Sequence, residues 1–401
     1  MQLHEIVDAV TADEPPLAHT ADDIVAAGRR AVRRRRAGFA SAGAAGLVAV
    51  AVGGVFALPS AGGPPTVTTE PGAAGTASQA AEAQWGTAEP FTFTFQGYDA
   101  GKFHVQNPIV ASTAYQIASV YMDGRTTNDK PVSPDEAAAN EKAAQDKIKG
   151  KPVGGGDPTI YAYLTVYRPG AFNPSGIKGG KSLTVAGHKA VQANLPAGLD
   201  PKHEILPGNK ELAWEYTNNA WAVVTSISDA NDPSFEDLAA LVPGLKPSTP
   251  QPAKLPFTVG YLPSGYQPVQ IGTHAMPGLS GISTAREGDY GGATFARPAP
   301  ATTGLTAPFE SSDGMIEGSF DIFVTPSGNS NQQARAGKTK CYGNGFCNVW
   351  SADGKVQVQV SDEGTGANLS EAELTKIAQS IKVADVTDEA TWTPAAKALQ
   401  P

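Results

Sequence analysis

The sequence predicts an α+β protein with two tandem modules, each an antiparallel sheet with a C-terminal helix, after a single transmembrane helix. Three observations lead to this prediction. An uncharged segment follows a cluster of arginines near the N-terminus, runs of β-branched and aromatic residues dominate the rest of the 401-residue chain, and its second half repeats landmarks of the first. The 44 glycines and 32 prolines favour strands and turns over long helices.

The predicted transmembrane helix is the run of 22 uncharged residues at 37–58, close to the ~20 residues that a helix needs to cross the hydrocarbon core. The arginines before it are Arg29, Arg30, Arg33, Arg34, Arg35 and Arg36. Because positive charge stays on the cytoplasmic side, we expect residues 1–36 inside the cell and the bulk of the chain outside. The alternative is a cleaved signal peptide, since Val55-Phe56-Ala57 offers a small-residue cleavage pattern.

Composition and spacing divide the chain into seven segments. They are a short cytoplasmic segment at 1–36, the transmembrane helix at 37–58, a flexible Pro/Gly-rich linker at 59–88, module 1 at 89–246, a linker at 247–254, module 2 at 255–386 and a tail at 387–401. The formal net charge of −9 lies entirely after residue 59, because six acids cancel six arginines before it. An acidic outer part disfavours contact with phosphate backbones, so nucleic acid is not an expected partner.

Strands are expected in short segments rich in β-branched and aromatic residues and bounded by Gly, Pro, Asn or Asp. The clearest are 159–167, 221–227, 319–324 and 355–360. Residues 218–219 and 353–355 are placed to form the hairpin turn after the tryptophan-bearing strand of each module.

The internal repeat is clearest where each module ends. With an offset of 136 residues, Trp214 aligns with Trp350 and Ser234 with Ser370. A serine with an acid three residues later begins a capped helix, and the Leu and Ile residues that follow form one apolar stripe. We therefore expect each module to end in a helix that covers one face of its sheet.

These motifs resemble uncharacterised single-pass envelope proteins of Gram-positive bacteria, whose tandem extracytoplasmic modules are similar to those of anti-sigma-like regulators. The resemblance is carried by "YLPSGYQPV" (261–269), "CNVWSADGKVQVQV" (347–360) and "LSEAELTKIAQSIK" (369–382), with weaker copies in the first module. It implies an extracytoplasmic protein that is anchored in the cell membrane and that could act as a regulator.

The sequence contains few candidates for chemistry. Cys341 and Cys347 flank a Gly-Asn-Gly turn, so two hairpin arms could join them in a disulfide in an oxidising compartment; free thiols are the alternative. The chain has no H-E-x-x-H pair, no phosphate-binding loop of full length and no G-x-S-x-G elbow, the motifs of common hydrolase and nucleotide sites. We therefore expect no enzymatic activity, no metal and no cofactor.

Trp214, Trp221 and Trp350 are the candidate groove residues. Core packing is the first explanation for Trp214 and Trp350, because a tryptophan between a sheet and a helix buries a large area. Trp221 aligns with Gln357 and could instead line a ligand groove that only the first module has.

The function expected from these features is that of a membrane-anchored binding or sensing protein, with an anti-sigma-like regulator as one form of it. Its expected partners are the lipid bilayer, an envelope ligand and a cytoplasmic protein at residues 1–36, where apolar residues at helical spacing form one small face. The alternative is a cell-envelope ligand-binding or scaffold protein with no signalling role, whose leader only inserts the chain.

Overall fold

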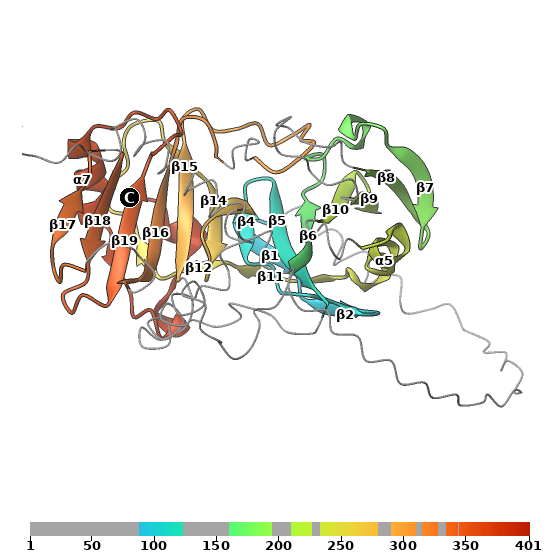
Figure 1. Ribbon diagram of the computed structural model, residues 1–401, viewed down its shortest axis with the longest axis horizontal. Helices are drawn as coiled ribbons and strands as arrows, with labels where there is room; N and C mark the ends of the chain where they lie inside the picture. Colours follow the sequence, from blue (N-terminus) through green and yellow to red (C-terminus); the bar gives the residue numbers. More distant parts are fainter. Residues whose placement is uncertain are drawn as a thin grey trace, which may run out of the picture. The chain divides into compact units, whose positions relative to one another are not determined.

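The computed structural model describes residues 88–122, 160–194, 210–226, 233–279, 290–309, 315–327, 334–343 and 345–401. These residues are mostly β-strand with few helices (Figure 1), which agrees with the predicted α+β class. No helix within them is long and apolar enough to cross a membrane. The predicted span at 37–58 and the arginines before it lie outside the described residues.

A 15-stranded antiparallel sheet contains most of the strands. Its order is β17 (Thr339–Cys341), β18 (Phe346–Trp350), β19 (Val356–Ser361), β16 (Ser319–Pro326), β15 (Gly291–Ala296), β14 (Gln267–Thr273), β4 (Val110–Ser112), β5 (Tyr115–Tyr121), β6 (Ile160–Tyr167), β10 (Ala220–Ser226), β9 (Lys210–Thr217), β8 (His188–Asn194) and β7 (Lys181–Val185). At one side β2 (Tyr98–Ala100) pairs with β3 (Phe103–Val105), which pairs with β5. We call the strands from β2 to β10 the N-terminal half of the sheet and those from β14 to β19 the C-terminal half.

The two halves join where β4 pairs antiparallel with β14, with Gly272 opposite Val110 and Gln270 opposite Ser112. Outward from this junction the strand orders match, because β4-β5-β6-β10-β9-β8 corresponds to β14-β15-β16-β19-β18-β17. A side chain at Gly272 would meet the backbone oxygen of Met276 at 2.1 Å. Glycine at this position therefore lets the loop after β14 approach the junction.

The predicted capped helices are present. In α5 (Phe235–Ala240) and in α7 (Glu371–Ser380), a serine side chain accepts a hydrogen bond from the third residue of the helix, and the acid at that position accepts one from the serine backbone. The other short helical segments are η1 (Pro174–Gly176), η2 (Val242–Gly244), η5 (Glu389–Thr391) and α8 (Ala395–Ala398). The sequence therefore predicts both helix starts correctly.

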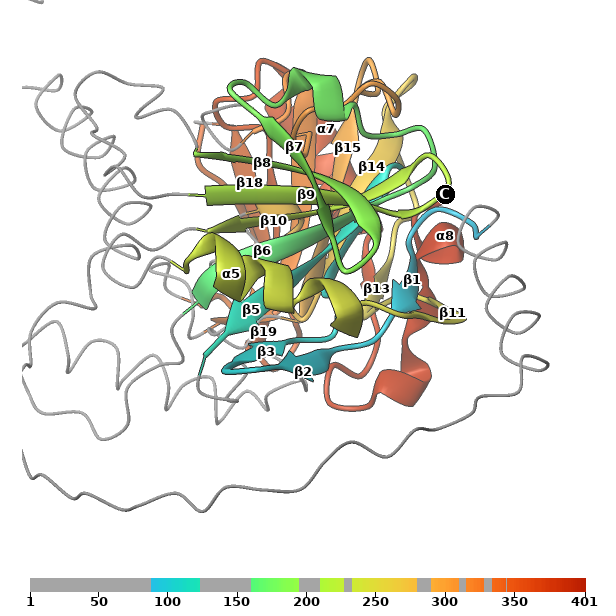
Figure 2. The ribbon, with the colours of Figure 1, turned by 90° about the vertical axis from the view of Figure 1, so that its right-hand side faces the viewer.

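Both capped helices pack on the same face of the sheet, which we call the helix face. Figure 2 shows α5 beside the strands of the N-terminal half. Ala111 belongs to the cluster under α7 and lies opposite Gln116, so both residues are on one face. Ala118, two residues after Gln116, is on that face as well and belongs to the cluster under α5. Leu238 of α5 and Ile377 of α7 are completely buried in these clusters. We call the other side of the sheet the open face.

Trp214 and Trp350 do not hold equivalent places, which corrects the expectation from the alignment. With the offset of 136 residues, Ala222 aligns with Val358. Trp214 lies opposite Ala222, but Trp350 lies opposite Gln357, one residue before Val358. A shift of one residue moves a side chain to the other face of a sheet. Trp214 therefore packs in the cluster under α5, while Trp350 points to the open face, away from Val358 and its cluster under α7.

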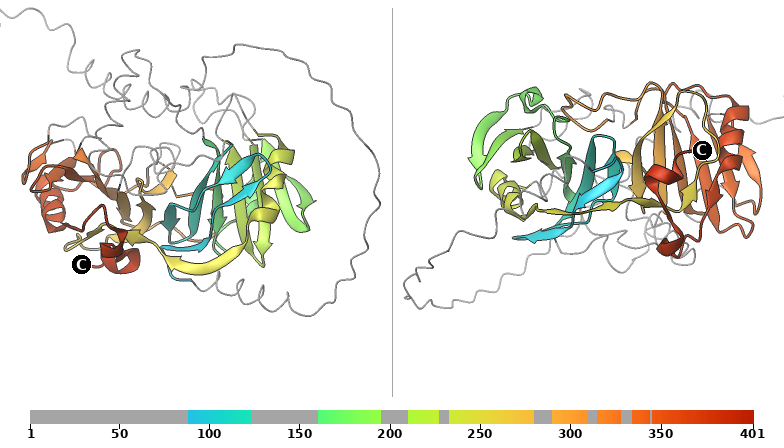
Figure 3. Two further views of the ribbon diagram at one scale, coloured as in Figure 1. Left: turned by 90° about the horizontal axis from the view of Figure 1, so that it is seen from below. Right: turned by 180° about the vertical axis from the view of Figure 1, so that it is seen from behind.

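Three short strand pairs lie outside the main sheet. They are β1 (Thr92–Phe95) with β11 (Pro247–Pro252), β12 (Lys254–Leu255) with β21 (Thr393–Pro394) and β13 (Phe257–Thr258) with β20 (Lys382–Val383). Residues 247–254, expected to be a linker, thus contain β11, the yellow strand that runs between the two halves in Figure 3. Residues 387–401, expected to be a tail, include Trp392 and Leu399, which are buried.

The predicted disulfide joins Cys341 to Cys347. The two residues lie directly opposite each other on β17 and β18, and the Sγ atom of Cys341 is 3.1 Å from the Oγ1 atom of Thr375 in α7. The bond therefore fixes the edge of the C-terminal half where the helix covers it.

Replacing both cysteines by serine is expected to lower the free energy of unfolding by about 2 kcal/mol, because the bond closes a short loop in the unfolded chain. Urea unfolding of the oxidised protein measures this change. Reductant should lower the stability of the wild type by a similar amount and leave the double variant unchanged. Equal stabilities of oxidised wild type and variant would contradict the assignment.

Candidate functional site

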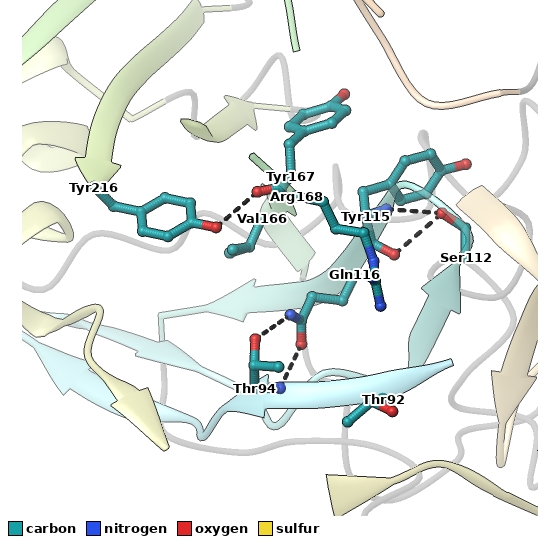
Figure 4. A pocket seen from close by; sticks show the side chains of 9 residues that line it. All are labelled: Thr92, Thr94, Ser112, Tyr115, Gln116, Val166, Tyr167, Arg168 and Tyr216. Atoms are coloured by element: carbon teal, nitrogen blue, oxygen red, sulfur yellow. Dashed lines mark hydrogen bonds between the residues drawn. The ribbon is translucent and has the colours of Figure 1, made fainter. Parts of the chain in front are cut away.

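A small cleft lies between β1 and the N-terminal half of the sheet, beside the junction of the two halves (Figure 4). It is lined by Thr92, Thr94, Ser112, Tyr115, Gln116, Val166, Tyr167, Arg168 and Tyr216. Hydroxyl, amide and guanidinium groups make most of this lining polar, and Arg168 is the only charged residue in it.

Gln116 attaches β1 to the sheet. Its Nε2 atom donates to Thr94 Oγ1 at 2.5 Å, and its Oε1 atom accepts from the backbone N–H of Thr94 at 3.0 Å. Both side chains are buried. Because β1 pairs only with β11 and not with the main sheet, this amide fixes one wall of the cleft.

The other walls are held by hydrogen bonds within the chain. Ser112 Oγ accepts from the backbone N–H groups of Ala114 and Tyr115 at 3.0 and 2.9 Å, which closes the tight connection between β4 and β5. Tyr216 OH donates to the backbone oxygen of Tyr167 at 2.7 Å. Burial raises the pKa of the Tyr216 phenol above its usual range, so this hydroxyl keeps its proton. These groups shape the cleft but have little capacity left for a ligand.

Arg168 follows β6 directly and extends toward β1 (Figure 4). Its Nη1 atom donates to the backbone oxygen of Ala88 at 2.6 Å and its Nη2 atom to that of Glu89 at 2.5 Å. No acidic side chain among the described residues forms an ion pair with it. Burial lowers the pKa of the guanidinium, the effect of desolvating a positive charge. The cleft therefore holds a charge that no acidic side chain in the described part of the chain neutralises.

On the open face, a chain of hydrogen bonds leads from Tyr115 into the C-terminal half. Tyr115 OH accepts from the backbone N–H of Phe309 at 2.9 Å and donates to Gln270 Oε1 at 3.1 Å. Gln270 Nε2 lies 3.5 Å from Thr294 Oγ1, which donates to Asp321 Oδ1 at 2.5 Å. Burial raises the pKa of Asp321 to about 6. The two halves of the sheet thus share one polar network across the junction, on the open face.

Replacing Asp321 by Asn is expected to make stability less dependent on pH. A carboxyl group whose pKa is raised on folding, here from about 3.9 to about 6, stabilises the fold when protonated and loses this contribution as the pH rises from about 4 through 6. The variant should gain stability relative to wild type at pH 8 but not at pH 4. Urea unfolding at both pH values tests this, and a wild-type curve as flat as that of the variant would contradict it.

The structure does not bring the three candidate tryptophans together. Trp214 lies on the helix face, and Trp221 lies on the open face of the same half, where its ring centroid is 6.3 Å from that of Phe172. Trp350 lies on the open face of the C-terminal half. None of the three lines the cleft at Arg168, so core packing accounts for the burial of Trp214 and Trp221.

Sequence reasoning missed the residues that form the cleft. Arg168 belongs to no motif, and its partners at 88 and 89 are backbone atoms far away in the sequence. Gln116 gave a usable signal, because it is the one amide in the otherwise apolar or small stretch "YQIASVY" at 115–121. A polar side chain in a fully buried strand needs a partner, and here that partner is Thr94.

Comparison with known proteins adds no family. The chain matches no protein-family model and no curated protein sequence. Among the described residues, no group of three or more His, Cys, Asp or Glu side chains is arranged to hold a metal ion. The resemblance to envelope proteins stays a prediction, and the arguments for function below rest on the cleft.

Proposed function

We propose that this chain is a membrane-anchored extracytoplasmic protein that binds a ligand and senses it without catalysing a reaction. The observation that supports this best is the half-buried charge of Arg168 in a small polar cleft. A guanidinium without a counter-charge attracts an anionic group. The other groups around it are held by hydrogen bonds within the chain, an arrangement suited to recognition.

The proposal includes two tandem modules, 89–246 and 255–386, each a sheet covered by its C-terminal helix. The matching strand orders on both sides of the junction support it, as do the two capped helices on the same face. In this arrangement β11 lies in the segment that connects the modules, and β1 pairs with it beside the cleft. The continuous sheet would then hold the residues of the binding site in fixed positions.

Sensing requires that the ligand site be coupled to the segment that leads to the membrane. Arg168 holds the backbone at residues 88 and 89, where the predicted linker at 59–88 meets the first strand. In the proposed topology this linker follows the transmembrane helix at 37–58, and residues 1–36 contact a cytoplasmic protein. A change at Arg168 would therefore act on residues 88 and 89, where the predicted linker ends.

The test combines protein chemistry with genetics. Mass spectrometry of the mature protein should find residues 1–36 still attached. In the host cell, Arg168→Gln and replacement of residues 2–20 by an unrelated sequence should alter the same set of transcripts. Arg297→Gln is the matched control, because Arg297 also donates to a backbone oxygen, that of Ser264 at 3.0 Å, but lines no part of the cleft.

Two results would contradict sensing. One is a mature N-terminus that begins after residue 57, which would leave no cytoplasmic segment. The other is a leader replacement without any effect on the transcripts that respond to Arg168→Gln, which would favour an envelope binding or scaffold protein.

A further inference from the structure

We propose that strand β7 (Lys181–Val185) is an interaction surface that pairs antiparallel with β7 of a second copy of this chain. This pairing goes beyond the proposed function and is independent of the cleft at Arg168. Three features support it: the position of β7 in the sheet, the direction of its backbone groups and a residue pattern that is complementary to itself.

β7 is the outer strand of the N-terminal half (Figure 1) and pairs only with β8 among the described residues. Its five residues keep an unbroken register with β8 and include no proline. Natural sheets protect their edges with prolines, bulges or very short strands. The outer strands β17 and β2 have three residues each, so β7 is the edge that can accept a further strand over the greatest length.

The turn after β7 determines which of its backbone groups point outward. Residues 186 and 187 have φ values of 50° and 85° and connect Val185 to His188. The pair that closes such a two-residue turn is hydrogen-bonded, and hydrogen-bonded pairs alternate with non-hydrogen-bonded pairs along the strands. The N–H and C=O groups of Ser182 and Thr184 therefore point away from β8. They have no hydrogen-bond partner in the described part of the chain.

The order of residues in β7 fits a two-fold axis at Leu183. Antiparallel pairing about this axis places Ser182 opposite Thr184 of the second copy, and the outward backbone groups then form four hydrogen bonds. Pairs of Ser and Thr across strands are favourable. Lys181, the only charged residue of β7, lies opposite Val185 and about 14 Å along the strands from its own copy. No like charges therefore oppose each other.

Leu183 makes the central contact of the pairing. Its side chain is half-buried and packs against the cluster under α5. At the axis it lies beside Leu183 of the second copy in a non-hydrogen-bonded pair, the kind in which side chains are closest. The pairing removes the exposed parts of both side chains from water, which is favourable. Because a strand of this length buries little area, we expect a weak dimer that depends on concentration.

The experiment uses the full chain in detergent micelles with one introduced thiol, since the two native cysteines are joined to each other. Oxidised glutathione should convert Leu183→Cys to a disulfide-linked dimer, measured on non-reducing gels. Val185→Cys is the matched control, because Val185 is half-buried on the same face of β7 but lies about 14 Å from its own copy. Cα atoms more than about 7 Å apart cannot be bridged without movement of the backbone, so Leu183→Cys should cross-link at least about 10-fold faster.

A second change tests the backbone hydrogen bonds. Thr184→Pro removes an N–H that points away from β8, a position where an edge strand tolerates proline, so its midpoint of urea unfolding should stay close to that of the wild type. Added to Leu183→Cys, it should slow cross-linking to the rate of Val185→Cys. Absence of the Leu183→Cys dimer would overturn the pairing. Equal rates for the two thiols, as association through the predicted transmembrane helix would give, would overturn it as well, and so would cross-linking of Leu183→Cys that a folded Thr184→Pro does not slow.

Discussion

Replacing Trp214 by Ala is expected to lower the free energy of unfolding by about 3–5 kcal/mol, the usual cost of removing a large aromatic side chain from a core. Trp214 is completely buried and packs with Leu212 and Leu238 in the cluster under α5. Its removal would leave a cavity between the sheet and the helix. Urea unfolding followed by circular dichroism measures the loss.

The control for this variant is Lys189→Ala on the neighbouring strand β8. The Lys189 side chain is 81% exposed and pairs with Glu215 at 3.0 Å, and exposed ion pairs contribute at most about 1 kcal/mol. A loss at Trp214 no larger than that at Lys189 would show that Trp214 does not pack in the core.

Replacing Gln116 by Leu is expected to cost about 2–4 kcal/mol, because it leaves the buried backbone N–H and the hydroxyl of Thr94 without their partner. The same change should release β1, since this amide fixes the strand beside the main sheet. Hydrogen exchange of the backbone at residues 92–95 should become faster, and unfolding experiments measure the cost in stability.

Gln251→Leu is the matched control for the effect on β1. Gln251 lies opposite Phe93 in the paired strand β11, but its side chain is exposed. It should leave both stability and exchange close to wild type. Equal exchange at residues 92–95 in the two variants would contradict the role of Gln116 in holding β1.

The sequence predicts those parts of the fold that depend on local patterns. Ser234 and Ser370 each have an acid three residues later, and both helices begin where this spacing places them. The disulfide likewise follows from two cysteines around one turn. These features need only neighbouring residues, so one sequence is sufficient to find them.

The faces of the two tryptophans depend on hairpin geometry, which the repeat does not preserve. Ala220 pairs with Thr217 and Trp221 with Glu215, so the β9–β10 hairpin contains an irregularity. The β18–β19 hairpin has none in its recorded register. One extra residue in a turn moves every side chain beyond it to the opposite face of the sheet. An alignment of residue types does not show such a shift.

The cleft could not be predicted because its parts come from distant segments. Arg168 reaches backbone atoms 79 and 80 residues away, and Tyr216 lies on a strand that a hairpin brings beside β10. The residue types of a sequence do not indicate which backbone oxygens accept hydrogen bonds from a distant side chain. Only the pairing of the strands shows that Arg168 lies half-buried in a cleft and forms no ion pair with an acid of the described residues.

Hydrogen exchange at residues 88–95 of the full chain, in the wild type and in Arg168→Gln, tests the central claim most directly. This claim is that Arg168 holds the segment at which the described part of the chain begins, through its hydrogen bonds to the backbone oxygens of Ala88 and Glu89. We predict faster exchange of this segment in Arg168→Gln than in the wild type and no change in Arg297→Gln. Equal exchange in the wild type and in Arg168→Gln would contradict it.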